Sequence, residues 1–185
     1  MMFESTPVAG AFVIRLDLHR DDRGFFARTF CIDEFEAAGI VTTFVQQSLA
    51  RSTLRGTLRG MHFQREPHGE EKLVRCTRGR IFDAIVDLRP NSPSFRRVFT
   101  VELDAEAGDA LFVPRGCAHG YQTLQDETDV LYAMSSRYAP HAARAIRYDD
   151  PALAIAWPLS EPILSAADGS APGLEAALAE VAATC

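Results

Sequence analysis

The stretch that decides the fold reads GDALFVPRGCAH, from Gly108 to His119. Its apolar run Ala110–Val113 predicts a short buried strand. The following Pro114-Arg115-Gly116 predicts a tight turn, because proline fixes its own φ and glycine accepts backbone angles closed to other residues. We expect this turn to lead into the β structure that carries His119.

Outward from this stretch, apolar and polar residues alternate with a period of two from about Val8 to Trp157. Such alternation is typical of strands, and glycine and proline turns recur at the spacing of a β-sandwich or barrel. Within Arg80–Leu88, Asp83 and Asp87 share one face with two isoleucines. The expected strands are Ala11–Leu18, Arg23–Phe30, Thr43–Gln47, Thr57–Gln64, Lys72–Thr77, Arg80–Leu88, Phe95–Leu103, Ala110–Val113 and Val130–Arg137.

Two helices are expected beside the strands. Asp33 is expected to cap the first, which ends at Gly39, and the alanine-rich segment Pro172–Ala183 has apolar residues at helical spacing. No repeat or low-complexity linker divides the chain, so we expect a single domain over residues 1–185. Its barrel core covers about residues 8–157, and a C-terminal tail with a helix covers residues 158–185.

Composition limits the class of protein. Hydrophobic residues make up 47% of the chain, charged residues 24%, and the formal net charge is −6, so no broad nucleic-acid-binding surface is expected. No apolar run has the length of a signal peptide or membrane span, which predicts a cytoplasmic protein that does not enter membranes. The four cysteines form no CxxC pair, so we expect reduced packing residues rather than disulfides or a zinc site.

Two glycine-led stretches carry a histidine each. Gly108-x5-Pro-x-Gly-x2-His119 resembles the second signature of the cupin superfamily, and Gly56-x5-His62-x-Gln64 resembles the first, with glutamine in place of a second histidine. The resemblance implies a mainly β, cupin-type double-stranded β-helix (jelly-roll) barrel with a few short peripheral helices. His62 and His119 alone make a poor ligand set for a transition metal, so no metal is expected. The other three histidines border turns and are given no role: His19, His68 and His141.

Longer stretches carry a closer resemblance. They are Arg23–Phe26, Leu58–Gln64, Lys72–Arg75, Val86–Arg89 with Ser92-Pro93, Val113-Pro114 with Ala118–Gly120, Tyr138–Pro140, and Asp149–Pro151 with Trp157-Pro158. In this order they are similar to the dTDP-4-dehydrorhamnose 3,5-epimerase family of nucleotide-sugar enzymes, over about residues 4–168.

The chemistry of that family explains why these residue types occur together. A 4-keto sugar has acidic C–H bonds on both carbons beside the ketone. Inverting one of them requires a base on one face, a proton donor on the other and a group that holds the enolate oxygen. No redox cofactor is needed, and the sequence contains no G-x-G-x-x-G fingerprint. The resemblance implies a cofactor-independent isomerase that inverts C3, C5 or both of a 4-keto-6-deoxy nucleotide sugar, as in dTDP-rhamnose and polysaccharide biosynthesis.

Four residues match the catalytic positions of the family. By this resemblance His62 is the base, and an imidazole is available as a free base near neutral pH. Asp168, in the stretch Ile163–Asp168, orients His62. Tyr132 donates a proton to the opposite face of the sugar. Lys72 is the only lysine among 19 basic residues, and the resemblance makes it the cation beside the enolate.

Five further residues match substrate contacts. Arg23 and Arg59 are expected to bind the diphosphate of a nucleotide-diphosphate sugar, a task that suits bidentate donors. Gln47 is expected to contact the nucleotide or sugar, His119 the sugar or phosphate, and Tyr138 to stack near the nucleotide. The resemblance also implies a homodimer in which N-terminal strands help to build the partner's sheet or site.

The sequence departs from the family pattern at positions that match substrate contacts. Arg28 stands where rhamnose-pathway members usually carry glutamate, Ser48-Leu49-Ala50 replaces a D-N-H-like stretch, and Ala143 and Ala167 replace residues that are often charged. The positions that match the reaction machinery are unchanged. This favours the same chemistry on a different or relaxed nucleotide sugar.

Three alternatives stay open. A related 3,4-ketoisomerase would not require Tyr132 as an acid opposite the base. A non-catalytic cupin would bind the nucleotide sugar without turning it over. A metal-dependent cupin oxygenase is disfavoured by the two-histidine ligand set.

Overall fold

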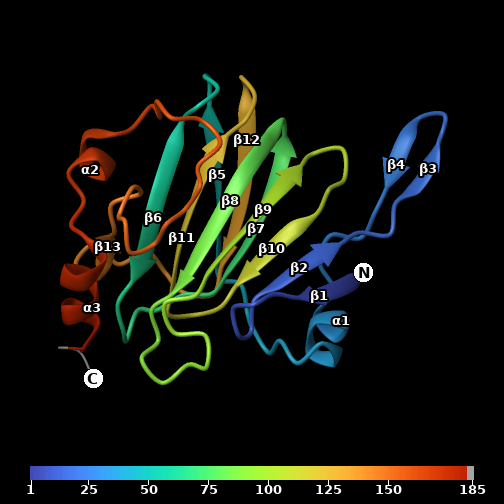
Figure 1. Cartoon of the computed structure of the whole chain (residues 1–185). Coiled ribbons are helices and arrows are strands. Elements are labelled where there is room, and N and C mark those ends of the chain that lie inside the picture. The colour runs from blue at the N-terminus through green and yellow to red at the C-terminus, as the bar shows by residue number, and fades with distance from the viewer. Residues whose placement is uncertain (183–185) are drawn as a thin grey trace.

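Strands dominate the structure, a computed structural model that describes residues 1–182 (Figure 1). One antiparallel sheet has six strands in the order β1-β2-β10-β7-β12-β5, and a second has five in the order β13-β6-β11-β8-β9. The strands are β1 Met2–Ser5, β2 Phe12–Arg15, β3 His19–Asp21, β4 Gly24–Phe26, β5 Gln46–Ser52, β6 Leu58–Gln64, β7 Lys72–Arg78, β8 Arg80–Asp87, β9 Val98–Asp104, β10 Ala110–Val113, β11 Cys117–Thr123, β12 Thr128–Met134 and β13 Ala143–Ala145. The helices are α1 Ile32–Ala37, α2 Ala166–Gly169 and α3 Leu174–Ala182.

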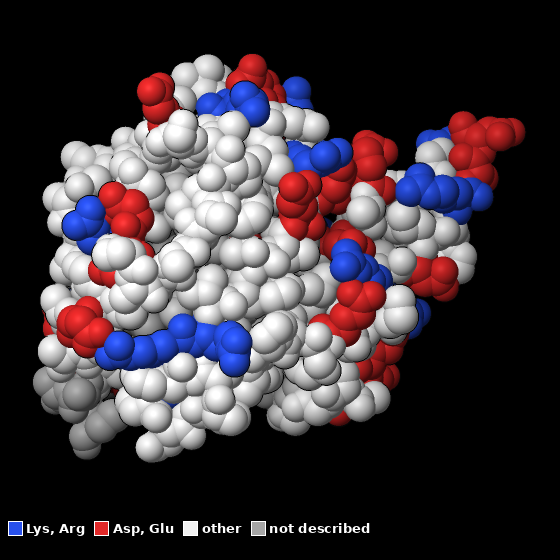
Figure 2. Space-filling view, viewed as in Figure 1, with Lys and Arg blue, Asp and Glu red and all other residues white. Residues whose placement is uncertain are grey.

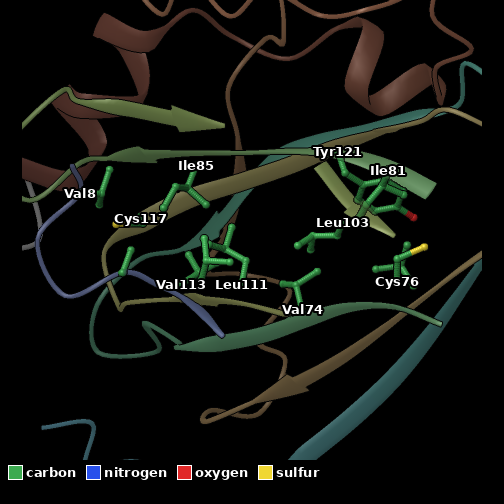
Figure 3. Close-up of a cluster of buried hydrophobic side chains, with 13 residues drawn as sticks. Val8, Val74, Cys76, Ile81, Ile85, Leu103, Leu111, Val113, Cys117 and Tyr121 are labelled. Atoms are coloured by element: carbon green, nitrogen blue, oxygen red, sulfur yellow. The ribbon is translucent and has the colours of Figure 1, made fainter. Parts of the chain in front are cut away.

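The path of the chain between the sheets is that of a jelly roll. From β5 onward the chain passes back and forth between the sheets, so most neighbouring strands are distant in sequence. Side chains of both sheets meet in a central apolar cluster, to which Val74 and Leu111 come from one sheet and Ile81, Ile85 and Tyr121 from the other (Figure 3). The predicted mainly β, cupin-type barrel with short peripheral helices is confirmed.

The strand β8 is buried on both faces. Ile81 and Ile85 point into the central cluster, while Ala84 and Val86 belong to a second cluster that includes Leu174 of α3. The C-terminal helix thus covers the outer face of the five-stranded sheet. Its apolar spacing is what made it predictable, and packing of that stripe is what stabilises a helix this short.

A buried carboxylate organises the turn that follows β8. Asp87 is fully buried and accepts hydrogen bonds from Arg89 Nε (2.8 Å), Ser92 Oγ (2.5 Å) and Ser94 Oγ (2.6 Å). Burial alone would raise the pKa of Asp87, but these donors outweigh it and lower the pKa to about 2. The charge is therefore kept, and it holds the loop that leads to β9.

Several predicted boundaries are wrong. The sequence pattern predicts no strand limits over Cys117–Thr123, but β11 lies there. It is fully buried at the centre of the five-stranded sheet. Asp33 does not cap α1: the N-cap is Cys31, which makes no side-chain cap hydrogen bond. The predicted strand Arg23–Phe30 is only the short β4, paired with β3 in a hairpin. The strand β5 begins three residues later than predicted and runs to Ser52.

The N-terminal region covers the outer face of the six-stranded sheet. Phe35 of α1 packs there with Phe112 of β10 and Ala133 of β12. The β3–β4 hairpin, in contrast, projects away from the body of the molecule (Figure 1). Phe26 at its end is 75% exposed.

Surface charges and cysteines complete the description. On the face drawn in Figure 2, acidic and basic residues form small mixed groups around a broad area without charge. No helix within residues 1–182 is long and apolar enough to cross a membrane.

Cys76 and Cys117 are buried and Cys31 is partly buried, all as free thiols, while Cys185 lies outside the described residues.

Candidate active site

Six of the nine predicted site residues line one cavity of about 340 Å³. His62 and His119 come from β6 and β11 of the five-stranded sheet, and Lys72 and Tyr132 from β7 and β12 of the facing sheet. The full lining is Arg59, His62, Lys72, His119, Tyr132, Ser165, Ala167 and Asp168. The cavity therefore lies between the two sheets, with candidate catalytic groups on both walls.

A close approach of two glycines brings β6 and β11 together. His62 and His119 are directly opposite in the strand pairing, so both point to the same side of the sheet. Gly60 has φ of +137°, and a Cβ at this position would lie 2.4 Å from Cα of Gly120. Only glycine fits such a contact, and it fixes the two imidazoles as neighbours.

His62 is held by a carboxylate from the C-terminal tail. Its Nε2 lies 2.5 Å from Oδ1 of Asp168, whose Oδ2 accepts a hydrogen bond from Ser165 Oγ at 2.9 Å. Ser165 Oγ also accepts the backbone N–H of Asp168 at 3.1 Å, which caps α2. The Nε2–H···Oδ1 contact leaves Nδ1 of His62 with its lone pair.

Contributions of opposite sign set the pKa of His62. Burial lowers it most, Asp168 raises it, and the positive charge of Lys72 and the nearby His119 lower it further. The net pKa lies below the ordinary histidine value. The neutral imidazole, which is the form that can accept a proton, therefore predominates at neutral pH.

Lys72 is a buried ammonium at the side of the cavity. Its Nζ lies 3.3 Å from Glu70 Oε1 and donates to the backbone oxygen of His62 at 3.3 Å. The charge is thus anchored close to the imidazole. Sequence reasoning missed Glu70, which precedes the lysine by two residues and had no distinguishing pattern.

Tyr132 stays protonated in its surroundings. Burial raises its pKa well above the ordinary value, and the neighbouring Tyr121 and Asp83 raise it further. Its ring packs edge-on against His119, with centroids 5.9 Å apart. A neutral phenol facing the cavity can donate a proton.

Asp83 is a supporting residue that the sequence analysis did not assign to the site. Its Oδ1 lies 2.6 Å from Nε2 of His119, and both side chains are buried. The sequence contains a signal for this role, since Asp83 lies between Ile81 and Ile85 on the strand face that turns into the barrel. An acid at such a position needs a partner inside the barrel.

Tyr138 lies beside the main cavity rather than in it. It lines a second cavity of about 360 Å³ that shares His62 and Ala167 with the first. Ala143 also lines this second cavity, and Tyr138 is 63% exposed at its side. Ala143 and Ala167, two of the positions that depart from the family pattern, thus line the cavity next to His62.

Two predicted residues lie elsewhere in the chain. Gln47 pairs with Ala133 on the outer face of the six-stranded sheet and lines a separate cavity of about 300 Å³. Arg23 lies at the turn of the β3–β4 hairpin, 89% exposed, and pairs with Asp21. Within one chain the structure does not bring either residue to His62.

No group of three or more His, Cys, Asp or Glu side chains is arranged to hold a metal ion within residues 1–182. His62 and His119 each bind a carboxylate of the protein instead. The arrangement provides a neutral base, a buried cation and a protonated phenol around one cavity.

Known proteins of the same architecture place the chain in a family. The sequence profile of dTDP-4-dehydrorhamnose 3,5-epimerase matches residues 5–176. A curated dTDP-4-dehydrorhamnose 3,5-epimerase of Sinorhizobium fredii is 39% identical over 175 residues, covering 94% of this chain and 90% of the relative.

Solved structures agree. The dTDP-6-deoxy-D-glucose-3,5-epimerase of Legionella pneumophila in complex with dTDP-4-keto-L-rhamnose is 36% identical with a TM-score of 0.91, covering 97% of this chain and 96% of that one. A 3'-monoepimerase of Streptomyces bikiniensis in complex with dTDP-quinovose is also 36% identical, with a TM-score of 0.86, covering 95% and 88%. The chain therefore belongs to the dTDP-4-dehydrorhamnose 3,5-epimerase family.

Proposed function

We propose that this protein is a cofactor-independent epimerase that inverts C3, C5 or both of a 4-keto-6-deoxy nucleotide sugar. The observation that carries the proposal is the opposition of two groups across one cavity. The His62–Asp168 pair lies on one wall, and the protonated Tyr132 projects from the facing sheet. A base and an acid on opposite sides of a substrate are what an inversion at carbon requires.

The proposed reaction begins with proton removal. Nδ1 of His62 takes the proton from the carbon beside the ketone. The electron pair of that C–H bond forms a double bond to the carbonyl carbon, and the π pair of the carbonyl moves onto its oxygen to give an enolate. Asp168 then stabilises the imidazolium through the 2.5 Å contact at Nε2. The ammonium of Lys72, which is itself buried, stabilises the oxygen charge, because an interaction with a group shielded from water is stronger than one in water.

Reprotonation on the other face completes the inversion. Tyr132 transfers its hydroxyl proton to the carbon as the enolate electrons return to it and the ketone re-forms. Solvent then reprotonates the phenolate and removes the proton from His62. Starting and final protonation states of the protein are the same, so no co-reactant is consumed.

Arg59, His119 and Tyr138 serve binding in this proposal. Arg59 lines the main cavity, and its guanidinium is fixed by Ser52 Oγ at 3.3 Å and the backbone oxygen of Arg51 at 3.1 Å. A guanidinium held this way suits the diphosphate. His119 contacts the sugar or phosphate, and the exposed ring of Tyr138 provides a surface for the base.

We further propose a homodimer, in which Arg23 and Gln47 act in the partner's site. The β3–β4 hairpin carries Arg23 away from its own barrel together with the exposed ring of Phe26. At the same time β5, which carries Gln47, is the edge of its sheet and exposes Leu49. An exposed edge and an exposed apolar arm are the features that a second copy would cover. We also propose that the chain works as one cytoplasmic domain.

A single-centre epimerase is the second candidate. The similarity to a 3'-monoepimerase favours it, as do the small residues Ala143 and Ala167 beside His62. They leave space that a larger residue would fill, which suits an altered sugar or nucleotide.

Proton exchange distinguishes these possibilities. The protein is incubated with dTDP-4-keto-6-deoxyglucose in deuterated water, and exchange is followed by NMR. Exchange at C3 and C5 supports inversion at both centres, whereas exchange at C3 alone supports the single-centre enzyme. His62→Asn should abolish exchange, while Asp149→Asn, which removes an exposed carboxylate, should leave it intact. Full exchange by His62→Asn would contradict the proposed mechanism.

A further inference from the structure

A second pair of histidines lies outside the candidate active site. His68, in the segment after β6, and His141, before β13, have their Nε2 atoms 3.2 Å apart. Neither residue is among those that line the cavity around His62 and Tyr132. The proposed epimerase chemistry gives the pair no role.

A buried amide holds the two segments in place. Gln64 is buried, and its Nε2 donates to the backbone oxygens of His68 at 3.2 Å and Arg137 at 3.3 Å. Its Oε1 accepts the backbone N–H of Ala139 at 2.6 Å. One side chain therefore bonds to both segments that carry the histidines. The backbone from which the two imidazoles project is therefore positioned before any ligand arrives, which reduces the entropy cost of binding.

The geometry of the pair matches two ligands of one metal ion. Two Zn–N bonds of about 2.0–2.1 Å at a tetrahedral angle place their nitrogens about 3.3 Å apart. The observed separation is 3.2 Å. The rings are perpendicular, at 89°, with centroids 4.8 Å apart, closer than a head-on N–H···N contact of this length would leave them. At least one ring is therefore inclined to the line between the two nitrogens, which aims its in-plane lone pair to the side of the direct contact.

We propose that His68 and His141 bind a divalent transition-metal ion of borderline softness, such as Zn²⁺, through their Nε2 atoms. Imidazole is a preferred ligand of such ions, and calcium or magnesium would require oxygen ligands instead. Because no three candidate ligand side chains meet within residues 1–182, water completes the coordination. The site is a surface site of modest affinity and has no part in proton transfer.

The position of the site gives it a consequence for the proposed function. His141 lies three residues after Tyr138, which is exposed beside the second cavity. A metal ion bound to both histidines links the segment that carries Tyr138 to the segment after β6. Metal binding restricts this part of the cavity rim. Only this consequence, and not the binding itself, rests on the proposed epimerase activity.

Isothermal titration with ZnCl₂ tests the site directly on the metal-free protein. We expect one zinc ion per chain for the wild type and a loss of affinity of ~10-fold or more in His68→Asn and in His141→Asn. His19→Asn is the matched control, since His19 is exposed on the distant hairpin and should bind zinc like the wild type. His62→Asn should also retain zinc binding, which separates this site from the catalytic histidine.

Two further measurements make the outcome decisive. Anomalous diffraction at the zinc edge should place the ion between the two Nε2 atoms. Zinc should raise Tm for the wild type and for His19→Asn but not for His141→Asn, while the Tm values without zinc stay alike. The proposal is overturned if neither histidine variant weakens zinc binding, if His62→Asn abolishes it, or if the wild type binds no zinc. None of these results depends on catalysis.

Discussion

The contact between His62 and Asp168 is the one on which the proposed chemistry depends most. The carboxylate fixes Nε2 and leaves Nδ1 free, and Ser165 in turn fixes the carboxylate. Each link is a directional hydrogen bond between groups in or beside a cavity. A change at any of them alters both the orientation and the basicity of the imidazole.

Asp168→Asn is expected to lower kcat by ~10²–10⁴-fold, because the imidazolium formed during proton abstraction loses its counter-charge. It should also move the acidic limb of the kcat/KM profile to lower pH. Asp168 raises the pKa of His62, so its removal lowers that pKa further and the imidazole stays neutral in more acidic solution. The pH–rate profile measures this shift. Asp149→Asn, which removes an exposed carboxylate, is the control, and an unmoved limb in Asp168→Asn would refute the role.

Lys72→Arg is expected to fail as a conservative replacement. A forked guanidinium does not fit the place of a compact ammonium that is fixed between Glu70 and the backbone oxygen of His62. We expect kcat to fall ~10²–10³-fold with a smaller change in KM, since the charge acts on the enolate rather than on the ground state. Steady-state kinetics separate the two constants. A normal kcat in the variant would show that the position requires only a positive charge.

Asp87 makes stability depend on acidity. Its folded-state pKa of about 2 lies below the ordinary value of 3.8, so its stabilisation is complete above about pH 4 and is lost as the pH falls through 2. The shift corresponds to about 2 kcal/mol of the free energy of unfolding. Urea unfolding at a series of pH values should show the difference between wild type and Asp87→Asn shrinking over this range. A constant difference would contradict the assignment.

Among the strands, the pairing of β6 with β11 depends on glycine. Gly60→Ala would place a methyl group 2.4 Å from Cα of Gly120 and in a positive-φ conformation. We expect a loss of roughly 2–4 kcal/mol in the free energy of unfolding, from overpacking and backbone strain together. Gly169→Ala is the matched control, because nothing lies within 4 Å of its Cβ position. Denaturant unfolding of both variants measures the difference, and equal stabilities would disprove the close contact.

The central strands were predictable because burial gives them a clear pattern. Lys72–Arg78, Arg80–Asp87 and Ala110–Val113 lie where periodicity and turn residues place strands. In contrast, β11 reads CAHGYQT, in which histidine, glycine and glutamine mask the apolar pattern. These polar residues are tolerated there because the protein supplies partners, as Asp83 does for His119. The sequence pattern therefore predicts β6, β7 and β12, which carry His62, Lys72 and Tyr132, but not β11, which carries His119.

The residues that line the main cavity were predictable from sequence motifs, whether they lie on barrel strands or in the tail. His62, Lys72, His119 and Tyr132 follow from strand motifs, and Asp168 from a short tail motif, and all five line one cavity. Arg23 shows the limit of such reasoning. A motif match assigns a role to a residue but does not tell which copy of the chain receives it, because that depends on assembly rather than on local sequence.

For the assembled molecule, mixing two inactive variants tests whether Arg23 acts in the partner's site. In a hybrid dimer of Arg23→Ala and His62→Asn, one site carries both changes and the other neither if Arg23 acts across the interface, whereas each site carries one change if Arg23 acts within its own chain. If Arg23 acts across the interface, unfolding and refolding an equal mixture should restore about a quarter of wild-type exchange. If Arg23 acts within its own chain, no activity returns. Sedimentation should confirm that both variants form dimers, and a monomeric wild type would overturn the proposed assembly.

The contact between His62 and Asp168 joins residues 106 positions apart in the chain. The tail that carries Asp168 reaches the barrel late in synthesis, through the backbone contact of Leu58 N–H with Ile163 O at 2.9 Å. A ribosome-bound or clipped chain that ends before this segment still contains every strand of both sheets, but its base has no partner. Proper folding of the barrel is therefore not sufficient for the proposed chemistry, because the carboxylate that orients the imidazole comes from a segment that follows the last strand.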